Sequence, residues 1–430
     1  MQHIFIWKMA ILALIIFILG YLAIAFENSL RLNKAASALI TGVFCWLIYF
    51  IHVPLTEQAS KSLLFHLGEI SSILFFLLGA MTIVELIDSH GGFDIITNKI
   101  KTKNKRTLIV IISILTFFLS ALLDNLTTAI VMTSISSKLL QQREDKLWFA
   151  GMIIIAANAG GVWSPLGDVT TTMLWIGGQI TAANISLNTF IPSVAVWLVP
   201  LTIIARRFRG KQLIKTENVN NPNVREGNIM LISGIILLLF VPVFKILTHT
   251  PPFMGMLLAL SFMWIITSFL HFKNIDGTQK KIITPSEALQ KIDTPSILFF
   301  LGILLAVSAL ESFGLLKNIA VFLDGTLKNH YLVGGFLGML SAVVDNVPLV
   351  AATQGMYDLS QYPTDNSFWE FIALTTGVGG SIIIIGSAAG VAVMGIEKIN
   401  FMWYLKNISW LAALGFIAGV FVFIIQQSVL

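Results

Sequence analysis

The chain has 430 residues, of which 56% are hydrophobic and only 11% are charged. Soluble domains carry about 25% charged residues, so this composition predicts an integral membrane protein and excludes a large soluble domain. The net charge of +5 does not indicate nucleic-acid binding, because basic residues of membrane proteins gather in cytoplasmic loops. The single cysteine, Cys45, excludes an intrachain disulfide and a thiolate metal cluster.

Three membrane helices are predicted at the start of the chain, at 4–26, 36–53 and 70–88. Each is about as long as the ~30 Å hydrocarbon core requires. The first is too long for a signal-peptide core and lacks a convincing cleavage site, so we expect it to be retained. A glycine pair, Gly91 and Gly92, then leads to a short amphipathic piece and a basic cluster at 99–106.

Residues 107–137 are predicted to form a re-entrant helical hairpin rather than one span. Basic residues flank both ends, at 105–106 and at 138–146. A single span would place one of these clusters outside, against the positive-inside rule. A turn at Asp124 leaves two arms of roughly 15 residues, or about 22 Å, which are too short to cross. Both basic clusters then stay in the cytoplasm.

The next segment, 147–180, is predicted to be one crossing with a break at 160–168. Three glycines and a proline lie within those nine residues, and they interrupt a helix. Unwound backbone at membrane depth is tolerated only where it is buried or lines a cavity. A fifth helix at 187–205 and a basic, Asn-rich linker at 206–228 complete the first half.

The second half repeats this plan. Ser-Ala-Leu-Leu-Asp-Asn at 120–125 returns as Ser-Ala-Val-Val-Asp-Asn at 341–346, 221 positions later. Phe-Phe-Leu within 72–77 likewise returns within 296–301, and Gly-Gly at 160–161 returns at 379–380. We expect helices at 229–247, 253–271, 295–313 and 408–425, a polar stretch at 273–291, a second hairpin at 331–357 and a broken crossing at 368–396.

The predicted fold class is an all-α integral membrane protein with about ten transmembrane helices, two re-entrant hairpins and two inverted-topology repeats with broken helices. Five crossings separate each element from its copy, and an odd number inverts the copy. This layout puts 22 of the 27 Lys and Arg residues in cytoplasmic loops and both chain ends in the periplasm. We divide the membrane domain into an N-terminal helix (1–35), a first transport repeat (36–206), a linker with a connecting helix (207–251) and a second transport repeat (252–430).

Inverted repeats with broken helices place a small-ligand site near the bilayer midplane. An acid there costs about 2.5–3.5 kcal/mol on insertion scales, which makes it a functional candidate by default. We expect Asp124, Asp168 and Asp345 to be Na⁺ ligands. The other candidate ion- or proton-binding residues are Asn125, Thr127, Thr128, Asn158, Thr170, Asn346 and Ser387 near the breaks, with Glu85 in the third helix.

These side chains offer hard oxygen ligands, which suit a desolvated alkali cation. A buried carboxylate can also hold a proton, so one group can exchange one ion for the other. We expect four stretches to line the site, 124–128, 158–171, 345–346 and 376–387. They contain no Lys or Arg, which argues against an anionic substrate unless sodium supplies the positive charge. Each acid also has a structural explanation: helix capping for Asp124 and Asp345, loop ordering for Asp168, and snorkelling for Glu85.

The chain resembles the NhaD-type sodium/proton antiporters of the ion transporter superfamily over nearly its whole length. The segments that carry the resemblance are 75–85, 120–128, 158–170 and 341–346. The resemblance implies exchange of Na⁺ or Li⁺ for H⁺ across a bacterial inner membrane, no cofactor, no nucleic-acid partner and a homodimer in the lipid bilayer. Related carboxylate symporters have Ser-Asn-Thr at the hairpin tips, and the acids in this chain favour a cation instead.

Three alternatives stay open at the level of sequence. One is an anion carrier of the same superfamily, for arsenite efflux or sodium-coupled carboxylate transport. Another is an intramembrane enzyme, for which the chain offers no HExxH, paired His, GxSxG or nucleotide-loop motif. The third is a passive channel, which an inverted repeat with acid-tipped hairpins does not favour.

Overall fold

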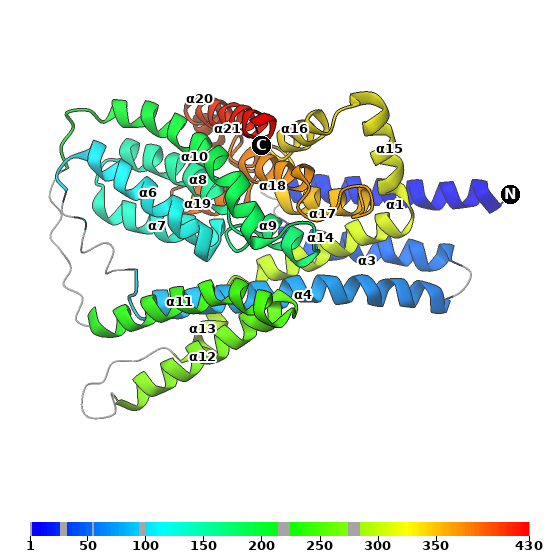
Figure 1. Cartoon of the computed structure of the whole chain (residues 1–430), viewed down its shortest axis with the longest axis horizontal. Helices are drawn as coiled ribbons and strands as arrows, with labels where there is room; N and C mark the ends of the chain where they lie inside the picture. Colours follow the sequence, from blue (N-terminus) through cyan, green and yellow to red (C-terminus); the bar gives the residue numbers. More distant parts are fainter. Residues whose placement is uncertain are drawn as a thin grey trace.

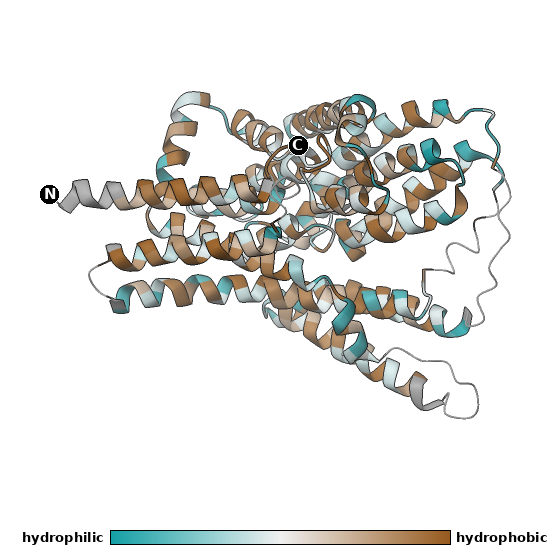
Figure 2. Ribbon diagram, turned by 180° about the vertical axis from the view of Figure 1, so that it is seen from behind, coloured by the Kyte–Doolittle hydropathy of each residue, from teal (hydrophilic) through white to brown (hydrophobic). Residues whose placement is uncertain are grey.

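The structure is a computed structural model that describes residues 2–25, 32–53, 56–93, 100, 102–213, 224–273 and 284–429. Its regular elements are helices, and the one β pairing among these residues is an isolated bridge between Asn104 and Gln212. Eight of the described helices are long and apolar enough to cross a membrane. Figure 2 shows hydrophobic residues along the helices and hydrophilic residues gathered toward many of their ends. The prediction of an all-α, multi-pass membrane protein is therefore confirmed.

Long helices lie together along one side of the molecule (Figure 1). Helix α3 packs against α1 and α14, and α4 packs against α11, α12 and α14. Many of their outward side chains are large and apolar, as a surface against lipid requires. The bounds of this group are α1 Gln2–Ala25, α3 Lys34–His52, α4 Thr56–Ser89, α11 Val224–Thr248, α12 Pro252–Lys273 and α14 Thr294–Ser312.

The hairpins, the broken crossings and the helices around them form the other side (Figure 1). From the first half come α6 Lys105–Leu123, α7 Asn125–Leu139, α8 Arg143–Gly161, α9 Val169–Ile176 and α10 Ala182–Arg207. From the second half come α15 Leu315–Leu327, α16 His330–Leu340, α17 Asn346–Met356, α18 Ser367–Gly379, α19 Ala388–Ile396, α20 Phe401–Asn407 and α21 Ser409–Val429. The two broken crossings are thus α8–α9 and α18–α19.

The third helix, α4, is longer than predicted. It begins at Thr56 instead of residue 70 and has 34 residues, about 51 Å at 1.5 Å per residue. Its first turns are polar and include the exposed ion pair between Lys61 and Glu57, at 2.8 Å. A prediction based on apolar length missed these turns because they extend beyond the length that the hydrocarbon core needs.

Three short helices were not predicted, α13, α15 and α20. Helix α13 (Pro285–Lys291) begins with a capping box between Thr284 and Glu287, inside the stretch expected to be merely polar. Helix α15 follows α14 and runs across the direction of the long helices (Figure 1). Helix α20 (Phe401–Asn407) lies between the second broken crossing and the last predicted helix. None of the three is long enough to span a bilayer, so a search for spans passes over them. The amphipathic piece expected after Gly92 and parts of the expected linker and polar stretch fall at 94–99, 214–223 and 274–283, outside the described residues.

The first hairpin turns at a single residue, Asp124, whose φ of 73° reverses the chain between α6 and α7. The ammonium group of Lys105, at the start of α6, contacts Asp145 at 2.6 Å and Gln142 at 3.0 Å, just beyond the end of α7. The outer ends of the two arms therefore meet. Helix α6 has 19 residues and is about 28 Å long, so this arm is longer than the ~15 residues that we expected. The reversal, rather than the arm length, makes this element a hairpin.

The second hairpin has a longer turn, residues 341–345, between α16 and α17. The rings of Tyr331 and Tyr357, at its two outer ends, lie 5.2 Å from Phe371 and 5.0 Å from Phe368 respectively. Both ends therefore meet at the start of α18. Whether the hairpins stop halfway through a bilayer remains a prediction, as does the division into domains.

The hairpins open at opposite ends of the molecule. At one end the backbone N–H of Lys105 donates to the carbonyl of Lys211 at 3.0 Å, and Arg207 pairs with Glu144. We call this the basic end, and it comprises residues 104–106, 138–146 and 206–212. At the other end the N–H of Thr181 donates to Asp365 at 2.6 Å. We call this the acidic end, and it comprises residues 177–184, 324–330 and 357–370.

The sequence repeat is also a repeat of contacts. In the first half the hydroxyl of Ser120 donates to the carbonyl of Ala157 at 2.6 Å. In the second half the hydroxyl of Ser341 donates to the carbonyl of Thr376, also at 2.6 Å. Each bond ties a hairpin to the neighbouring broken helix just before its break. The halves therefore share a local architecture as well as a sequence pattern.

Two glycines show how tightly each hairpin packs on its broken helix. A Cβ on Gly160 would lie well inside van der Waals contact with the carbonyl of Phe117. A Cβ on Gly379 would clash in the same way with the carbonyl of Gly338. Glycine is required at both positions because the obstacle is backbone and cannot rotate away.

Candidate functional site

Asp168 lies at the centre of the predicted site. It is the N-cap of α9, and its Oδ1 accepts hydrogen bonds from the backbone N–H and the hydroxyl of Thr170, both at 2.9 Å. The side chain is buried, with 1% of its residue surface exposed. A buried carboxylate is tolerated only with such hydrogen-bond partners. The break before α9 is therefore explained by the capping of α9 by Asp168 as well as by the glycines that precede it.

Two asparagines, one from each hairpin tip, converge on Asp168. The Nδ2 of Asn125 donates to its Oδ2 at 2.7 Å, and the Nδ2 of Asn346 lies 3.3 Å from both oxygens. Asn125 is the first residue of α7 and Asn346 is the first residue of α17. Residues more than 170 positions apart in the chain, Asp168 and Asn346, are therefore joined directly.

Asn158 extends this network to the second broken crossing. Its Oδ1 accepts from Asn125 at 3.0 Å, and its Nδ2 donates to the hydroxyls of Ser381 at 2.8 Å and Ser387 at 3.0 Å. Asn158 is fully buried. One amide side chain thus links the first hairpin to the break between α18 and α19.

The two tip acids are half-buried, and each caps a helix. Asp124 accepts from the backbone N–H of Thr127 at 2.7 Å and from its hydroxyl at 2.8 Å. Asp345 accepts through Oδ1 from the N–H of Val347 at 3.2 Å. Its Oδ2 accepts no hydrogen bond from the residues that the structure describes, which leaves lone pairs for another ligand. Asp168 is close enough to repel both tip acids electrostatically.

A small cavity of about 30 Å³ lies between these elements. Since roughly 10–15 Å³ holds one water molecule, the space fits about two or three groups of that size. Its polar lining includes all three carboxylates, and no Lys or Arg is part of it. The full lining is Leu77, Met81, Asp124, Asn125, Leu126, Asp168, Val169, Ser296, Phe300, Asp345, Asn346, Val347 and Ala388.

Two predicted residues lie outside this network. Glu85 is one helical turn beyond Met81 on α4, where it accepts from Ser89 at 2.6 Å and pairs with Lys291 at 3.5 Å. The hydroxyl of Thr128 is buried and has no hydrogen-bond partner among the described residues. The structure thus gathers the other nine candidates around the breaks and leaves Glu85 and Thr128 apart.

The sequence reasoning missed three kinds of neighbour. Tyr21, on α1, accepts through its hydroxyl from the backbone N–H of Asp345 at 2.7 Å. Ser381 binds Asn158, and it lies within the stretch 376–387 that was expected to line the site, although it was not named as a candidate ligand. Met81 and Phe300 supply apolar walls of the cavity. No local motif marks Tyr21, because it reaches the second tip from more than 300 residues away.

The three carboxylates do not form one compact metal cluster. Within the described residues, no three His, Cys, Asp or Glu side chains are placed to hold one metal ion together. An ion in the cavity would therefore use one or two carboxylates, with amide, hydroxyl or backbone oxygens completing its shell. This pattern suits a weakly held alkali cation better than a resident transition metal.

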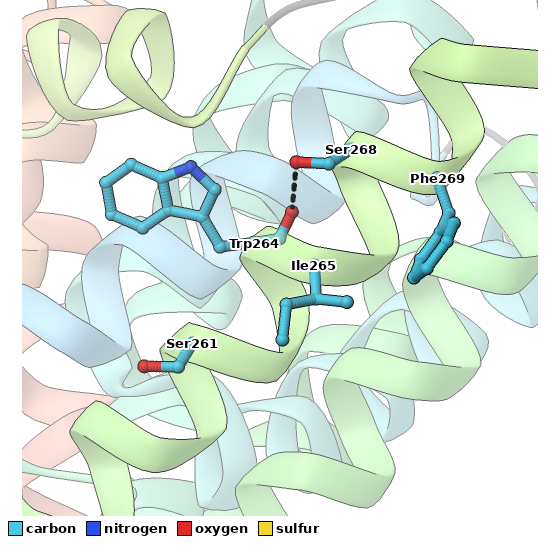
Figure 3. A pocket seen from close by; sticks show the side chains of 5 residues that line it. All are labelled: Ser261, Trp264, Ile265, Ser268 and Phe269. Atoms are coloured by element: carbon cyan, nitrogen blue, oxygen red, sulfur yellow. Dashed lines mark hydrogen bonds between the residues drawn. The ribbon is translucent and has the colours of Figure 1, made fainter.

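A larger hollow of about 510 Å³ lies elsewhere, along the outer face of α12. Figure 3 shows its five lining side chains on one helix, with the hydroxyl of Ser268 donating to the carbonyl of Trp264 at 3.0 Å. Phe269 is 72% exposed there. The hollow is an open apolar surface rather than an enclosed site, and none of the carboxylates lines it.

Comparison with known proteins places the chain in a family. The family described as Citrate transporter (CitMHS) matches residues 21–377. Sodium/proton antiporter 1 of Arabidopsis thaliana is 46% identical over 409 residues, which cover 94% of this chain and 70% of the relative. Sodium/proton antiporter 2 of the same plant is 42% identical over 95% of this chain and 98% of the relative.

A bacterial relative extends this result. The Na⁺/H⁺ antiporter NhaD of Vibrio cholerae is 30% identical over 436 residues, which cover 95% of this chain and 90% of the relative. The alignments include both hairpins and both broken crossings, because they cover nearly the whole chain. Proteins of this kind are secondary transporters and not enzymes. The chain belongs to the NhaD-type sodium/proton antiporter family of the ion transporter superfamily.

Proposed function

We propose that this protein exchanges Na⁺ or Li⁺ for H⁺ across a membrane, through the cavity between the two hairpin tips and the break before α9. The observation that carries the proposal is the convergence of three carboxylates on a cavity of about 30 Å³ without Lys or Arg in its lining. This space suits a dehydrated monovalent ion, whereas a carboxylate substrate such as citrate is several times larger. The relatives named as sodium/proton antiporters support the same reading.

The exchange follows from the cost of an uncompensated charge. A carboxylate with little water around it is stabilised either by a bound cation or by a proton. The free Oδ2 of Asp345 and the partly free oxygens of Asp124 face the cavity and are the groups at which the two ions compete. Asp168, which is saturated with donors, holds both tips at the site and adds negative charge.

An anion carrier is the second candidate, and one observation favours it. The ammonium group of Lys34 lies 5.1 Å from the ring centre of Phe299 and interacts electrostatically with Asp345. A cation at that distance could help to attract a carboxylate. Lys34 does not line the cavity, however, so the acids would still meet the substrate first.

Measurement of proton flux in proteoliposomes separates the two candidates. A pH-sensitive dye is followed while Na⁺, Li⁺, K⁺, citrate or arsenite is added separately to vesicles with an acidic interior. We expect dequenching with Na⁺ or Li⁺ and none with citrate or arsenite. A response to citrate or arsenite alone would replace the antiporter proposal with the anion carrier.

We further propose a bacterial inner membrane as the location, with the basic end in the cytoplasm and both chain ends outside. The basic residues at 138–146 and 206–212 support this orientation through the positive-inside rule. The Arabidopsis relatives make a plant membrane the alternative location. Labelling of Gln141→Cys in a Cys45→Ser background tests the orientation, because a cytoplasmic thiol is protected from impermeant reagents added outside.

A homodimer is proposed as well. The exposed apolar side chains of α11 and α12, such as Ile236 and Ile265, offer a surface for lipid or for a second copy. Native mass spectrometry in detergent distinguishes a dimer from a monomer directly.

A further inference from the structure

A second polar cavity lies next to the ion cavity, on the side of the acidic end. Its volume is about 350 Å³, so it is large enough for a hydrated cation with several waters. We name it the outer vestibule. Its lining is His66, Glu69, Ile70, Ser72, Ile73, Met173, Ile176, Gly177, Gln179, Pro251, Leu304, Val307, Ser308, Glu311, Ala351 and Gln354.

Four helices line both cavities, and on each of them the two lining residues are four positions apart. On α4 the ion cavity is lined by Leu77 and the outer vestibule by Ile73, four residues earlier. On α14 the corresponding pair is Phe300 and Leu304. Residues four apart lie one above the other on one face of a helix, about 6 Å along its axis. These walls of the ion cavity therefore continue into walls of the outer vestibule.

The other two walls follow the same rule. On α17 the pair is Val347 and Ala351, and on α9 it is Val169 and Met173. The outer vestibule and the ion cavity are thus separated by a collar one helical turn thick. We define the collar as the side chains of these four pairs, which are all apolar. A hydrophobic constriction of this kind closes a pore to water and ions while it stays narrow.

Two carboxylates, those of Glu69 and Glu311, line the outer vestibule. Glu69 is exposed over 61% of its side chain and pairs with His66 at 3.6 Å. Pro251, in the connection between α11 and α12, is also exposed. Glu311 lies deeper, against Gly355 of α17, where a Cβ would come within 3.1 Å of its carboxylate. Two carboxylates therefore flank the path from the surface to the collar, and they favour cations over anions.

We propose that the outer vestibule is the access route by which monovalent cations reach the ion cavity from the acidic end, and that the one-turn apolar collar is its gate. The inference rests on the proposed function, which supplies the ion that travels. It adds the route and the gate, and it assigns Glu69 and Glu311 to the path of the cation.

Thiol labelling tests this route with two matched pairs of variants in a Cys45→Ser background. Ala351→Cys lines the outer vestibule, whereas Ala352→Cys, the next residue, does not, although both alanines pack against the cluster around Leu310 and Leu316. Ser72→Cys also lies in the outer vestibule, and its neighbour Ser71→Cys does not. A membrane-impermeant, positively charged methanethiosulfonate is added to the external face of oriented vesicles, and modification and Na⁺-driven proton flux are measured in the same samples.

We expect Ala351→Cys and Ser72→Cys to be modified at least tenfold faster than Ala352→Cys and Ser71→Cys. Modification of Ala351→Cys should lower exchange at least tenfold relative to its own unmodified baseline. Equal modification within each pair, or full modification without loss of exchange, would overturn the route. The serine pair keeps the test valid if Ala351→Cys does not fold.

The two proposals fail separately in this experiment. If unmodified protein exchanges Na⁺ but the vestibule thiols are inert, the route is wrong and the proposed function stands. If the vestibule thiols react selectively but unmodified protein moves no protons with Na⁺ or Li⁺, the proposed function is wrong and the external accessibility of the outer vestibule is supported.

Discussion

The two halves of the molecule share their scaffold contacts but differ in chemistry. Ser120 and Ser341 make the same hydrogen bond to the neighbouring broken helix, with the same length. At the breaks themselves the halves diverge. Asn158, Asp168 and Thr170 of the first half correspond to Gly377, Ser387 and Ala389 of the second, 219 positions later.

The polar groups at the breaks of the first half have smaller counterparts in the second. At Gly377 a Cβ would clash with the side chain of Val162 and would lie in ordinary contact, 3.6 Å, with the Oδ2 of Asp168. The duplicated backbone determines where the helices are interrupted. The first half supplies most of the polar side chains at these interruptions. We infer that substitutions in the scaffold should act alike in both halves, whereas substitutions of the ligands should not.

The largest expected effect is on folding. Gly160→Ala and Gly379→Ala each drive a methyl group into a backbone carbonyl of the neighbouring hairpin. Overpacking against backbone should cost at least about 3 kcal/mol in each half. Thermal unfolding in detergent measures this, with Gly335→Ala as the control because nothing lies within 4 Å of its Cβ position. Large destabilisation in only one half would show that the halves are not packed alike.

Next in size is the effect of the buried acid on exchange. Asp168→Asn removes the charge and half of the acceptors that bind Asn125, Asn346 and Thr170. We expect exchange to fall roughly 100-fold, which corresponds to about 2.7 kcal/mol. Initial rates of Na⁺-driven proton flux in proteoliposomes provide the measurement.

The matched change in the second half is Ser387→Ala. It removes one acceptor of Asn158 and the cap of α19, so we expect a cost near 1 kcal/mol and a loss of exchange of about fivefold. Equal losses for Asp168→Asn and Ser387→Ala would mean that the two breaks contribute alike, against the asymmetry seen in the contacts.

A smaller effect is expected from the hairpin tips. Tyr21→Phe leaves the backbone N–H of Asp345 without its acceptor, and no residue plays this part for Asp124 in the described structure. The lost hydrogen bond should cost about 1 kcal/mol and lower exchange roughly fivefold or less. The apparent affinity for Na⁺ measures it. An unchanged affinity would show that the second tip does not depend on α1.

The smallest effect belongs to Glu85. Its partners are Ser89 and Lys291, and it does not line the cavity. We therefore expect Glu85→Gln to change the apparent Na⁺ affinity by less than about threefold, in the range typical of half-exposed ion pairs. A loss of apparent Na⁺ affinity of tenfold or more at any pH would show that Glu85 takes part in transport.

Much of the fold followed from the sequence because two strong rules agreed. The repeat fixed the correspondence of the halves, and the basic residues around 107–137 required a reversal there. The structure has that reversal at Asp124. The unpredicted helices α13, α15 and α20 are too short for either rule, and the early start of α4 lies outside the apolar run on which the prediction depended.

The site was predictable in its residue types but not in its connections. Acids and amides in apolar surroundings indicated the two hairpin tips and the break before α9, where Asp124, Asp345 and Asp168 each cap a helix. Their roles within the site depend on which oxygen remains free, and only the structure separates the saturated Asp168 from the open Oδ2 of Asp345. Tyr21 could not be found from any motif, because its contact is made through tertiary packing alone.

The central claim is that Na⁺ and H⁺ compete for the tip carboxylates. Na⁺ is added to purified protein in unbuffered detergent solution, and the released protons are counted for wild type, Asp124→Asn and Asp345→Asn. The account predicts proton release by wild type and little or none by either variant, with thermal stability kept, because a buried neutral amide costs less than an unpaired charge. If either variant binds Na⁺ and releases protons as wild type does, that aspartate is not an exchange site.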